Sequence, residues 1–214
     1  MKFTNVFFIN GTAYAGKSTM VAALARSHDG IACGENYHDA LIAGLDRAAF
    51  PNLTYTRDLT DWGAFVRRTP DEYEAWIEGC VRECTVLELQ ILTELAKQDK
   101  KVFVDTNIPT EVLAEISDPD HVLIMLADPA VSVSRFFDRP DREKQFLYQL
   151  LLREPHPEQA MENFRQCLSR INSAENYQKF LHAGFQVLFR DETRSVAETL
   201  RLAERCFHLP ETAP

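Results

Sequence analysis

The chain of 214 residues contains little glycine, little proline and no long apolar segment. With 8 glycines and 10 prolines, it is neither collagen-like nor a low-complexity chain rich in these two residues. Its longest strongly apolar run covers residues 122–127, whereas a membrane-spanning helix needs about 20 such residues. Hydrophobic residues make up 45% and charged residues 26% of the chain, which is ordinary for a folded protein. We therefore expect one folded domain over residues 1–214 that does not bind a membrane.

Positive charge and cysteine are also in short supply. The 23 Lys and Arg residues are outnumbered by 32 Asp and Glu residues, so the net charge is −9, and nucleic acid is not an expected partner. The apolar segment at residues 6–9 is shorter than the about 7 to 15 residues of a signal peptide, so we expect a cytoplasmic protein. The cysteines are odd in number and irregularly spaced, which argues against a disulfide framework and a zinc site: Cys33, Cys80, Cys84, Cys167 and Cys206.

Five short segments rich in apolar residues are predicted to be β-strands. Each is followed by a segment whose apolar residues recur at helical spacing. This alternation is typical of a parallel sheet covered by helices on both faces, so the predicted fold class is α/β. The predicted strands cover residues 2–10, 30–34, 101–105, 122–127 and 185–189.

The predicted helices include one long helix and one that closes the chain. Residues 71–97 carry a single apolar stripe, for which core packing is the expected role; its members are Tyr73, Trp76, Cys80, Cys84, Leu87, Ile91 and Leu95. In the closing helix at residues 193–207, Val196, Leu200 and Leu202 are expected to face the core. Other helices are predicted at residues 16–26 and from Pro109 and Pro129, the last behind an Asp128 cap.

Two intervals between predicted strands are too long to be simple crossovers. The first covers residues 40–99 and the second covers residues 139–183, where Met161, Phe164, Leu168 and Ile171 form another helical stripe. Both intervals follow the carboxyl ends of strands, and ligands of open α/β sheets bind at that edge. We therefore divide the domain into two insertions and a core of about residues 1–39, 100–138 and 184–209.

The strongest functional signal lies at residues 11–18, which match the phosphate-loop pattern G-x-x-x-x-G-K-[ST] at every fixed position. The match lies between a predicted strand and a predicted helix, as phosphate binding by main-chain N–H groups requires. Gly11 and Gly16 allow a tight turn and a close approach to phosphate oxygens. Lys17 can bridge the terminal phosphates of a nucleotide, and the Ser18 hydroxyl can hold Mg²⁺.

A second signal is the carboxylate of Asp105 at the end of a predicted apolar strand. This is the pattern known as Walker B, in which the carboxylate holds a magnesium-bound water. The motifs of signalling GTPases are missing, because the segment at residues 96–99 has no Asn at its first position and no Asp-x-x-Gly follows a strand suitably. The sequence therefore predicts Ser18 and Asp105 as the metal-binding pair.

With these motifs the chain resembles the nucleoside and nucleotide kinase group, which includes adenylate, shikimate and deoxynucleoside kinases. Ile9, Asn10 and Gly11, together with residues 15–18, are most similar to chloramphenicol phosphotransferase-like enzymes. The resemblance implies a three-layer α/β/α P-loop NTPase fold with five parallel strands in the order 2-3-1-4-5. It also implies an acceptor-binding insertion at residues 40–99 and a mobile lid with a helical segment at residues 139–183.

The same resemblance implies an ATP- and Mg²⁺-dependent phosphotransferase that is a monomer or a homodimer. Its nucleoside triphosphate would contact the loop, the lid and the segment after the fifth strand. The nucleotide-binding residues that the resemblance implies are Gly11, Thr12, Ala13, Tyr14, Ala15, Gly16, Lys17, Ser18, Thr19, Arg135 and Arg190. Within the loop, Tyr14 can stack on a ligand, cap the site or lie at an exposed tip.

Two arginines resemble the R-x-x-x-R segment that enters the lid of such kinases. Arg135 and Arg139 are one helical turn apart, so one helix face is expected to present both, and Pro140 should end that helix. Their catalytic role would be to neutralise charge on the phosphoryl group in flight. The alternative is an exposed ion-pair patch with Asp138, Asp141 and Glu143.

The acceptor side is marked by carboxylates after the second strand. Glu35 or Asp39 is the candidate catalytic base for a hydroxyl acceptor, with Glu35 favoured, although this segment can instead cap a helix. A phosphate acceptor would need arginines, and the insertion offers Arg47, Arg57, Arg67 and Arg68. No Arg directly follows Asp105, which departs from the deoxynucleoside kinase pattern.

The function that the sequence favours is transfer of the γ-phosphoryl group of ATP to a small-molecule hydroxyl or phosphate. The alternative is a nucleotide-binding or nucleotide-hydrolysing switch or assembly protein without such an acceptor. A nucleic-acid end kinase is disfavoured by the net charge of −9.

Overall fold

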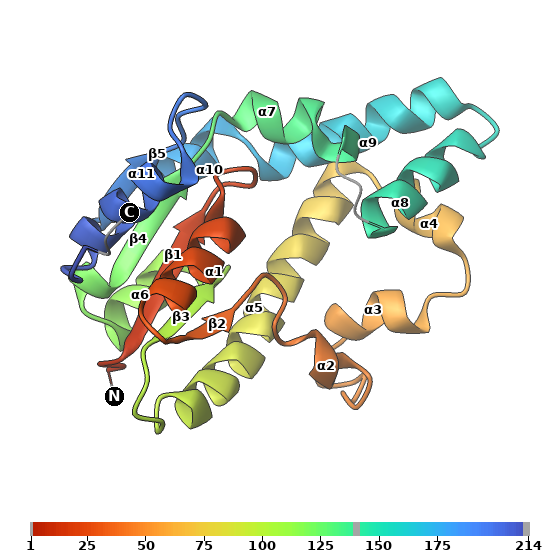
Figure 1. Ribbon diagram of the computed structural model, residues 1–214. Coiled ribbons are helices and arrows are strands. Elements are labelled where there is room, and N and C mark those ends of the chain that lie inside the picture. Colours follow the sequence, from red (N-terminus) through yellow and green to blue (C-terminus); the bar gives the residue numbers. More distant parts are fainter. Residues whose placement is uncertain (1, 139–141, 212–214) are drawn as a thin grey trace.

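The centre of the molecule is a five-stranded parallel sheet. In this computed structural model, which describes residues 2–138 and 142–211, the strand order is β2-β3-β1-β4-β5 and every neighbouring pair is parallel (Figure 1). The predicted α/β class and the strand order implied by the resemblance are confirmed. The strands are β1 (Val6–Gly11), β2 (Ile31–Cys33), β3 (Val102–Asp105), β4 (Val122–Leu126) and β5 (Gln186–Phe189).

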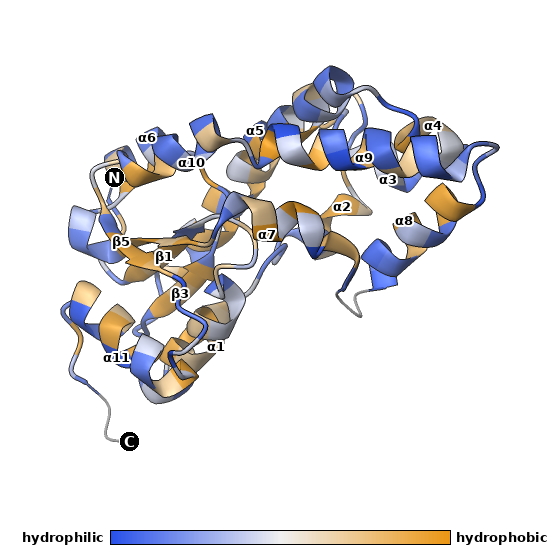
Figure 2. Cartoon of the chain, turned by 90° about the horizontal axis from the view of Figure 1, so that it is seen from above, coloured by the Kyte–Doolittle hydropathy of each residue, from blue (hydrophilic) through white to orange (hydrophobic). Residues whose placement is uncertain are grey.

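The two faces of the sheet are both apolar, because side chains alternate along each strand. Phe7, Phe103 and Met125 pack on one face, against helices α1 (Lys17–Ser27) and α11 (Val196–Cys206). Phe8 and Val104 pack on the other face, which is covered by the carboxyl half of α5 (Pro70–Leu95) and by α6 (Thr110–Ile116) and α10 (Ala174–Leu181). The strands therefore appear as an apolar layer between helices in Figure 2.

The two long intervals share one helical core beside the sheet. Phe65, Tyr73, Leu151 and Phe164 belong to the same buried cluster, which joins the first interval to the second. Figure 1 shows the helices of this cluster grouped at the end of α5 that is remote from the chain termini. The remaining elements are α2 (Asp39–Ile42), α3 (Leu53–Asp58), α4 (Trp62–Val66), α7 (Pro129–Ser134), α8 (Arg142–Leu152), α9 (Pro157–Ile171) and the 3-10 turns at Pro119–His121 and Phe136–Asp138.

Helix α5 begins where its local sequence requires. The Thr69 side chain accepts a hydrogen bond from the Glu72 N–H while the Glu72 side chain accepts one from the Thr69 N–H, and Pro70 occupies the first turn. Such a reciprocal cap contributes about 1 kcal/mol. The predicted stripe is only part of the buried face, because Gly79, Glu88 and Leu92 are buried as well. A buried carboxylate on this helix is a feature that apolar periodicity does not detect.

Two local expectations are wrong. Val196 is 55% exposed, whereas Leu200 and Leu202 pack against the core as expected, together with Ala203 and the C-cap residue Phe207. Helix α7 ends at Ser134, and Arg135 is its C-cap before a 3-10 turn, so no continuous helix carries Arg135 toward Arg139. Arg139, Pro140 and Asp141 lie outside the described residues. Over the described part of the chain, no helix combines the length and the apolar character needed to cross a membrane.

Candidate functional site

The 11–18 loop connects the end of β1 to the start of α1. Gly11 has φ +126°, and a Cβ there would lie 2.0 Å from the Met125 carbonyl oxygen of the neighbouring strand β4. Gly16 has φ +92° and caps α1 in the left-handed conformation. Both glycines are therefore required by the backbone, because L-residues rarely adopt such angles. The loop leads directly into the N-terminus of α1, whose free N–H groups attract anions.

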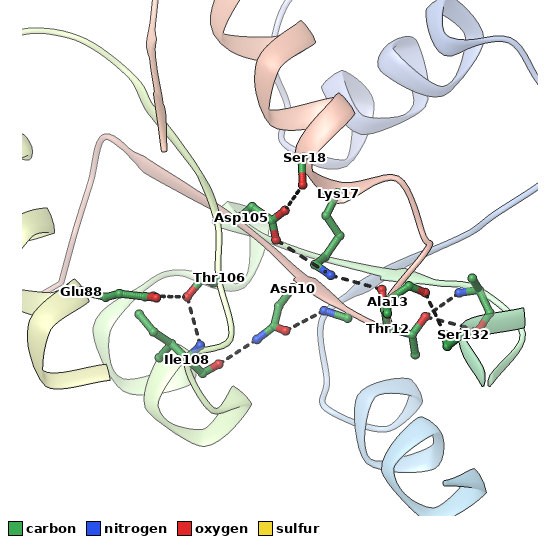
Figure 3. Close-up of polar contacts among 12 residues, drawn as sticks. Asn10, Thr12, Ala13, Lys17, Ser18, Glu88, Asp105, Thr106, Ile108 and Ser132 are labelled. Carbon is green, nitrogen blue, oxygen red and sulfur yellow. Dashed lines mark hydrogen bonds and ion pairs between the residues drawn. The ribbon is translucent and has the colours of Figure 1, made fainter. Parts of the chain in front are cut away.

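Side chains fix this loop to the segments that follow β4 and β5. The Thr12 hydroxyl accepts a 2.7 Å hydrogen bond from the Ala127 N–H, and Ser132 of α7 donates to the Ala13 carbonyl at 3.2 Å (Figure 3). Tyr14, in the left-handed region at φ 64°, donates through its hydroxyl to the Arg135 carbonyl, and its own carbonyl accepts from Arg190. Tyr14 thus joins the loop to two neighbouring segments and is not an isolated tip.

Lys17, Ser18 and Asp105 meet at the carboxyl ends of β1 and β3. The Ser18 hydroxyl donates to Oδ2 of Asp105 at 2.6 Å, and the Lys17 ammonium lies 3.9 Å from Oδ1 of Asp105 and 3.2 Å from the Thr12 carbonyl (Figure 3). Burial raises the pKa of Asp105, and the positive charge of Lys17 and the Ser18 hydrogen bond act against that shift. A nearby cation would therefore stabilise the charged form of this carboxylate.

This donor set fits a hard cation held together with phosphate. A hydroxyl and a carboxylate supply the oxygen ligands that Mg²⁺ prefers, and Mg²⁺ keeps several waters and takes its other ligands from phosphates. Among the described residues, no group of three or more His, Cys, Asp or Glu side chains could hold a metal by itself. The pair of Ser18 and Asp105 therefore suits a metal that arrives with a nucleotide better than a metal in an all-protein cage.

A cavity of about 650 Å³ opens beside Lys17 and Ser18. Its walls come from the 11–18 loop, from Glu35 after β2, from the segment at residues 107–111, and from α5 through Ile77 and Val81. The remaining wall is the junction of α9 and α10, which contributes Ile171, Asn172, Ser173, Asn176, Tyr177, Lys179 and Phe180. This mixture of apolar, amide and hydroxyl groups, and its volume, are typical of a small-molecule site.

The two candidate bases occupy different positions. Glu35 lines the cavity. Asp39 is not among the lining residues; it begins α2 and lies 3.8 Å from Nε2 of His38. Burial raises the pKa of Asp39, His38 acts in the opposite direction, and Glu35 adds to the rise. The structure thus brings Glu35, rather than Asp39, to the same cavity as Lys17.

The candidate nucleotide-side arginines are separated from that cavity. Arg190 lines a smaller hollow of about 180 Å³ with Gly16, Thr19 and Phe189, and its guanidinium pairs with Glu192 at 2.9 Å. Arg135 is exposed at the end of α7, and the part of the chain that the structure describes places no carboxylate within ion-pair distance of its guanidinium. The hollow beside Arg190 adjoins the first turn of α1 through Thr19 and Met20.

The arginines of the first interval do not line the main cavity. Arg57 donates to the carbonyls of Ile42 and Leu45, and Arg67 pairs with Glu154 at 3.1 Å. The Arg68 guanidinium lies over the Tyr55 ring at 4.1 Å from its centroid, where a cation–π contact stabilises it. These arginines therefore hold the helical part of the molecule together, and Arg47 has no contact with the cavity either.

Several features of the site escape sequence reasoning. Asn10, Glu88 and Thr106 are buried polar residues, and neither the burial of Glu88 nor the hydrogen bonds that connect these distant segments were predicted. Asn176 and Lys179 lie in an interval assigned only a helical pattern. A buried carboxylate on a helix and a wall formed by a distant helix junction leave no local sequence signal, so only the three-dimensional arrangement reveals them.

Comparison with known proteins adds no relative. No protein-family model matches the chain, and no curated protein is significantly similar to it. Any functional proposal for this chain therefore depends on the geometry of its own site.

Proposed function

We propose that this protein is an ATP- and Mg²⁺-dependent phosphotransferase that moves the γ-phosphoryl group to a hydroxyl of a small molecule without a phosphate group. The observation that carries the proposal is one cavity lined by both Lys17 and Glu35. A phosphate-binding lysine and a candidate proton acceptor are then within reach of the same bound molecule. The proposal includes the resemblance to phosphate-loop kinases, and with it the expectation of a lid at residues 139–183.

The nucleotide side of the proposal depends on the 11–18 loop. Its main-chain N–H groups, the N-terminus of α1 and the Lys17 ammonium together form a site for the phosphates of ATP. Ser18 and Asp105 would hold Mg²⁺, which supplies charge neutralisation for the phosphates when bound. The hollow of about 180 Å³ beside Arg190 and Phe189 would take the nucleobase, because it continues from the same loop.

The acceptor side favours a hydroxyl over a phosphate. Among the described residues that line the main cavity there is no arginine, and the charged ones are Lys17, Lys179, Glu35 and Glu111. Lys179 already pairs with Glu175 at 3.1 Å. A second phosphate in this cavity would face two carboxylates without a bidentate guanidinium partner, which is unfavourable. Amide side chains and the Tyr177 and Phe180 rings suit a neutral acceptor with polar and apolar parts.

The chemistry follows from these positions. The acceptor oxygen forms a bond to the γ-phosphorus while the bond from that phosphorus to the β,γ-bridging oxygen breaks, and ADP leaves with the electron pair. Glu35 takes the proton of the acceptor hydroxyl. Lys17 neutralises charge that develops on the transferred group and on the leaving phosphate.

The test is a transfer assay with γ-labelled ATP and Mg²⁺. The panel contains neutral hydroxylated molecules, such as nucleosides, sugars and amino alcohols, and nucleoside monophosphates as the contrasting class. We expect label in at least one hydroxyl acceptor and none in the monophosphates. Label released only as inorganic phosphate would favour the hydrolysing switch, and the absence of calorimetric heat with any nucleoside triphosphate and Mg²⁺ would reject nucleotide binding altogether.

A further inference from the structure

A continuous chain of hydrogen bonds runs through buried side chains from helix α5 to the first residue of the 11–18 loop. Glu88 of α5 accepts from the Thr106 hydroxyl at 2.7 Å, and Thr106 Oγ1 accepts from the Ile108 N–H at 3.0 Å. The Ile108 carbonyl accepts from the Asn10 side-chain amide at 2.7 Å, and the Asn10 amide oxygen accepts from the Gly11 N–H at 2.6 Å (Figure 3). Each link is shorter than or close to the usual length.

The other oxygen of Glu88 extends the chain to the segment after β2. Oε1 of Glu88 lies 3.0 Å from Nδ1 of His38, and Nε2 of His38 lies 3.1 Å from the Cys84 sulfur. A carboxylate only accepts, so a hydrogen bond in this pair is donated by Nδ1–H of His38, and the second ring nitrogen contacts the Cys84 sulfur. Glu88 therefore joins the segment that carries Glu35 to the segment that follows Asp105.

The side chains that form this chain of hydrogen bonds are buried, which favours one set of hydrogen-bond partners. Glu88 is 2% exposed, and Asn10 and Thr106 are each 1% exposed. A buried polar group that loses its partner cannot turn to water, which costs about 1 to 3 kcal/mol for a neutral group and more for a charge. The arrangement with every partner in place is therefore strongly preferred over any shifted arrangement of the same segments.

We propose that Glu88 and Thr106 are positioning residues that couple the acceptor side of the site to its nucleotide side. The proposal rests on the phosphotransferase function proposed above. Thr106 directly follows Asp105 and its N–H donates to the Ile9 carbonyl at 3.1 Å, so the turn at residues 106–108 is held from both sides. Through this turn, α5 determines where Gly11 begins the loop and where Asp105 ends its strand, while His38 connects the same carboxylate to the segment of Glu35.

The critical variant is Thr106→Val, which preserves side-chain shape but removes both hydrogen bonds of the hydroxyl. We expect the Gly11 amide proton to exchange with solvent about tenfold faster, because the Ile108 carbonyl is no longer fixed as the partner of Asn10. We expect kcat to fall about 10- to 100-fold, with KM for ATP within about twofold, since small misplacement of reacting groups affects the rate more than binding. Thr106→Ser restores the hydroxyl and should restore both quantities.

The matched control is Thr85→Val on the same helix α5. The Thr85 hydroxyl donates to the Val81 carbonyl one turn earlier, at 2.7 Å, so its loss removes a local bond and no link between described segments. We expect unchanged Gly11 exchange and unchanged kcat. Glu88→Gln should retain most of the activity, because its amide can accept from Thr106 and donate to Nδ1 if His38 adopts the other tautomer.

The outcomes test the coupling by Glu88 and Thr106 separately from the phosphotransferase function. If Thr106→Val leaves Gly11 exchange as in the unaltered protein, the coupling is wrong whether or not the protein is a kinase. If no acceptor is phosphorylated and Gly11 still responds to Thr106→Val, the link stands and the phosphotransferase is rejected. Should Thr106→Val fail to fold, exchange in the unaltered protein decides: the Gly11 and Ile108 amides should open at rates within about tenfold of each other, and free exchange of Gly11 beside a protected Ile108 would overturn the link.

Discussion

The Ser18 hydroxyl donates a 2.6 Å hydrogen bond to the carboxylate of Asp105, across 87 positions of sequence. The contact exists because β1 and β3 are neighbours in register, with Ile9 opposite Asp105. Ser18 lies in the first turn of α1, which follows β1, and Asp105 ends β3, and parallel strands bring both to the same edge of the sheet. The proposal that this pair holds Mg²⁺ depends on this arrangement, and the first prediction concerns metal dependence.

Asp105→Asn should weaken the effect of Mg²⁺ on nucleotide binding. The amide keeps the size of the side chain but removes the negative charge, and loss of such a partner commonly lowers metal affinity about 10- to 100-fold. Calorimetric titration of ADP at a series of Mg²⁺ concentrations measures this effect. The exposed Asp120→Asn is the control, and equal Mg²⁺ dependence in both variants would contradict the assignment of Asp105.

Lys17→Ala should reduce phosphoryl transfer by about 10²- to 10³-fold without unfolding the protein. The Lys17 ammonium contacts the Thr12 carbonyl and lies 3.9 Å from Asp105, and neither contact holds the sheet together. Turnover and thermal unfolding are measured side by side, with Lys100→Ala, which removes an exposed pair with Asp29, as the control. Full turnover in Lys17→Ala would show that phosphoryl transfer does not depend on the 11–18 loop.

The fold could be predicted from the sequence where the local patterns are strong. Apolar runs identified all five strands, and the Asp128 and Pro129 pair correctly marked the start of α7, where Asp128 accepts from the Ala130 N–H. Strand order came from the resemblance, since a pattern of strands and helices does not determine which strands are neighbours. The start of β1 at Val6 instead of Lys2 reflects pairing with β3 and β4, which no single strand encodes.

Only part of the site could be predicted from the sequence, because some of its residues are recognisable only through partners far away in the chain. Gly11, Gly16 and Lys17 are recognisable because their chemistry depends on positions close together in the chain. Glu88 was not recognised, because a carboxylate on a helix usually faces water, and its burial depends on partners at His38 and Thr106. The α7 boundary at Ser134 was missed, because the Arg135 carbonyl accepts from the Asp138 N–H in a 3-10 turn and from the Tyr14 hydroxyl of a distant segment.

Glu35→Gln and Asp39→Asn should behave differently, although both neutralise a carboxylate after β2. Glu35 lines the cavity with Lys17, so its loss as a general base should lower kcat about 10²- to 10⁴-fold with little change in nucleotide affinity. Asp39 does not line the cavity, so Asp39→Asn should retain nearly full turnover. Steady-state kinetics with the identified acceptor measures both, and the reverse pattern would reassign the base.

Gly11→Ala should destabilise the whole protein. The new Cβ would lie 2.0 Å from the Met125 carbonyl at a φ of +126°, so strain and displacement of β4 combine, and we expect a loss of about 3 kcal/mol or more. Gly34→Ala is the control, because no atom lies within 4 Å of its Cβ position. Denaturant unfolding compares the two, and equal stability of both variants would mean that the loop is not held against β4 in solution.

The thiols of buried Cys33 and half-buried Cys80 should make the protein less stable in alkali. Burial, with a smaller contribution from Glu88, raises the pKa of Cys33 to about 11, and burial with Glu83 raises the pKa of Cys80 to about 12, whereas an unfolded thiol has a pKa of about 8.5. Folding therefore favours the protonated thiols. Their contribution to the free energy of unfolding is complete below pH about 8.5 and is lost as the pH rises toward the folded pKa values.

Two measurements check this sign. Denaturant unfolding between neutral pH and pH 10 should show a steeper loss of stability in the unaltered protein than in a Cys33→Ala, Cys80→Ala variant, which lacks the two titrating groups. Iodoacetamide at pH 8 should label both thiols slowly in the folded protein, since only about one Cys33 in a thousand is then a thiolate, and rapidly in denaturant. An identical pH dependence in protein and variant, with rapid labelling of the folded state, would mean that these two thiols are open to solvent.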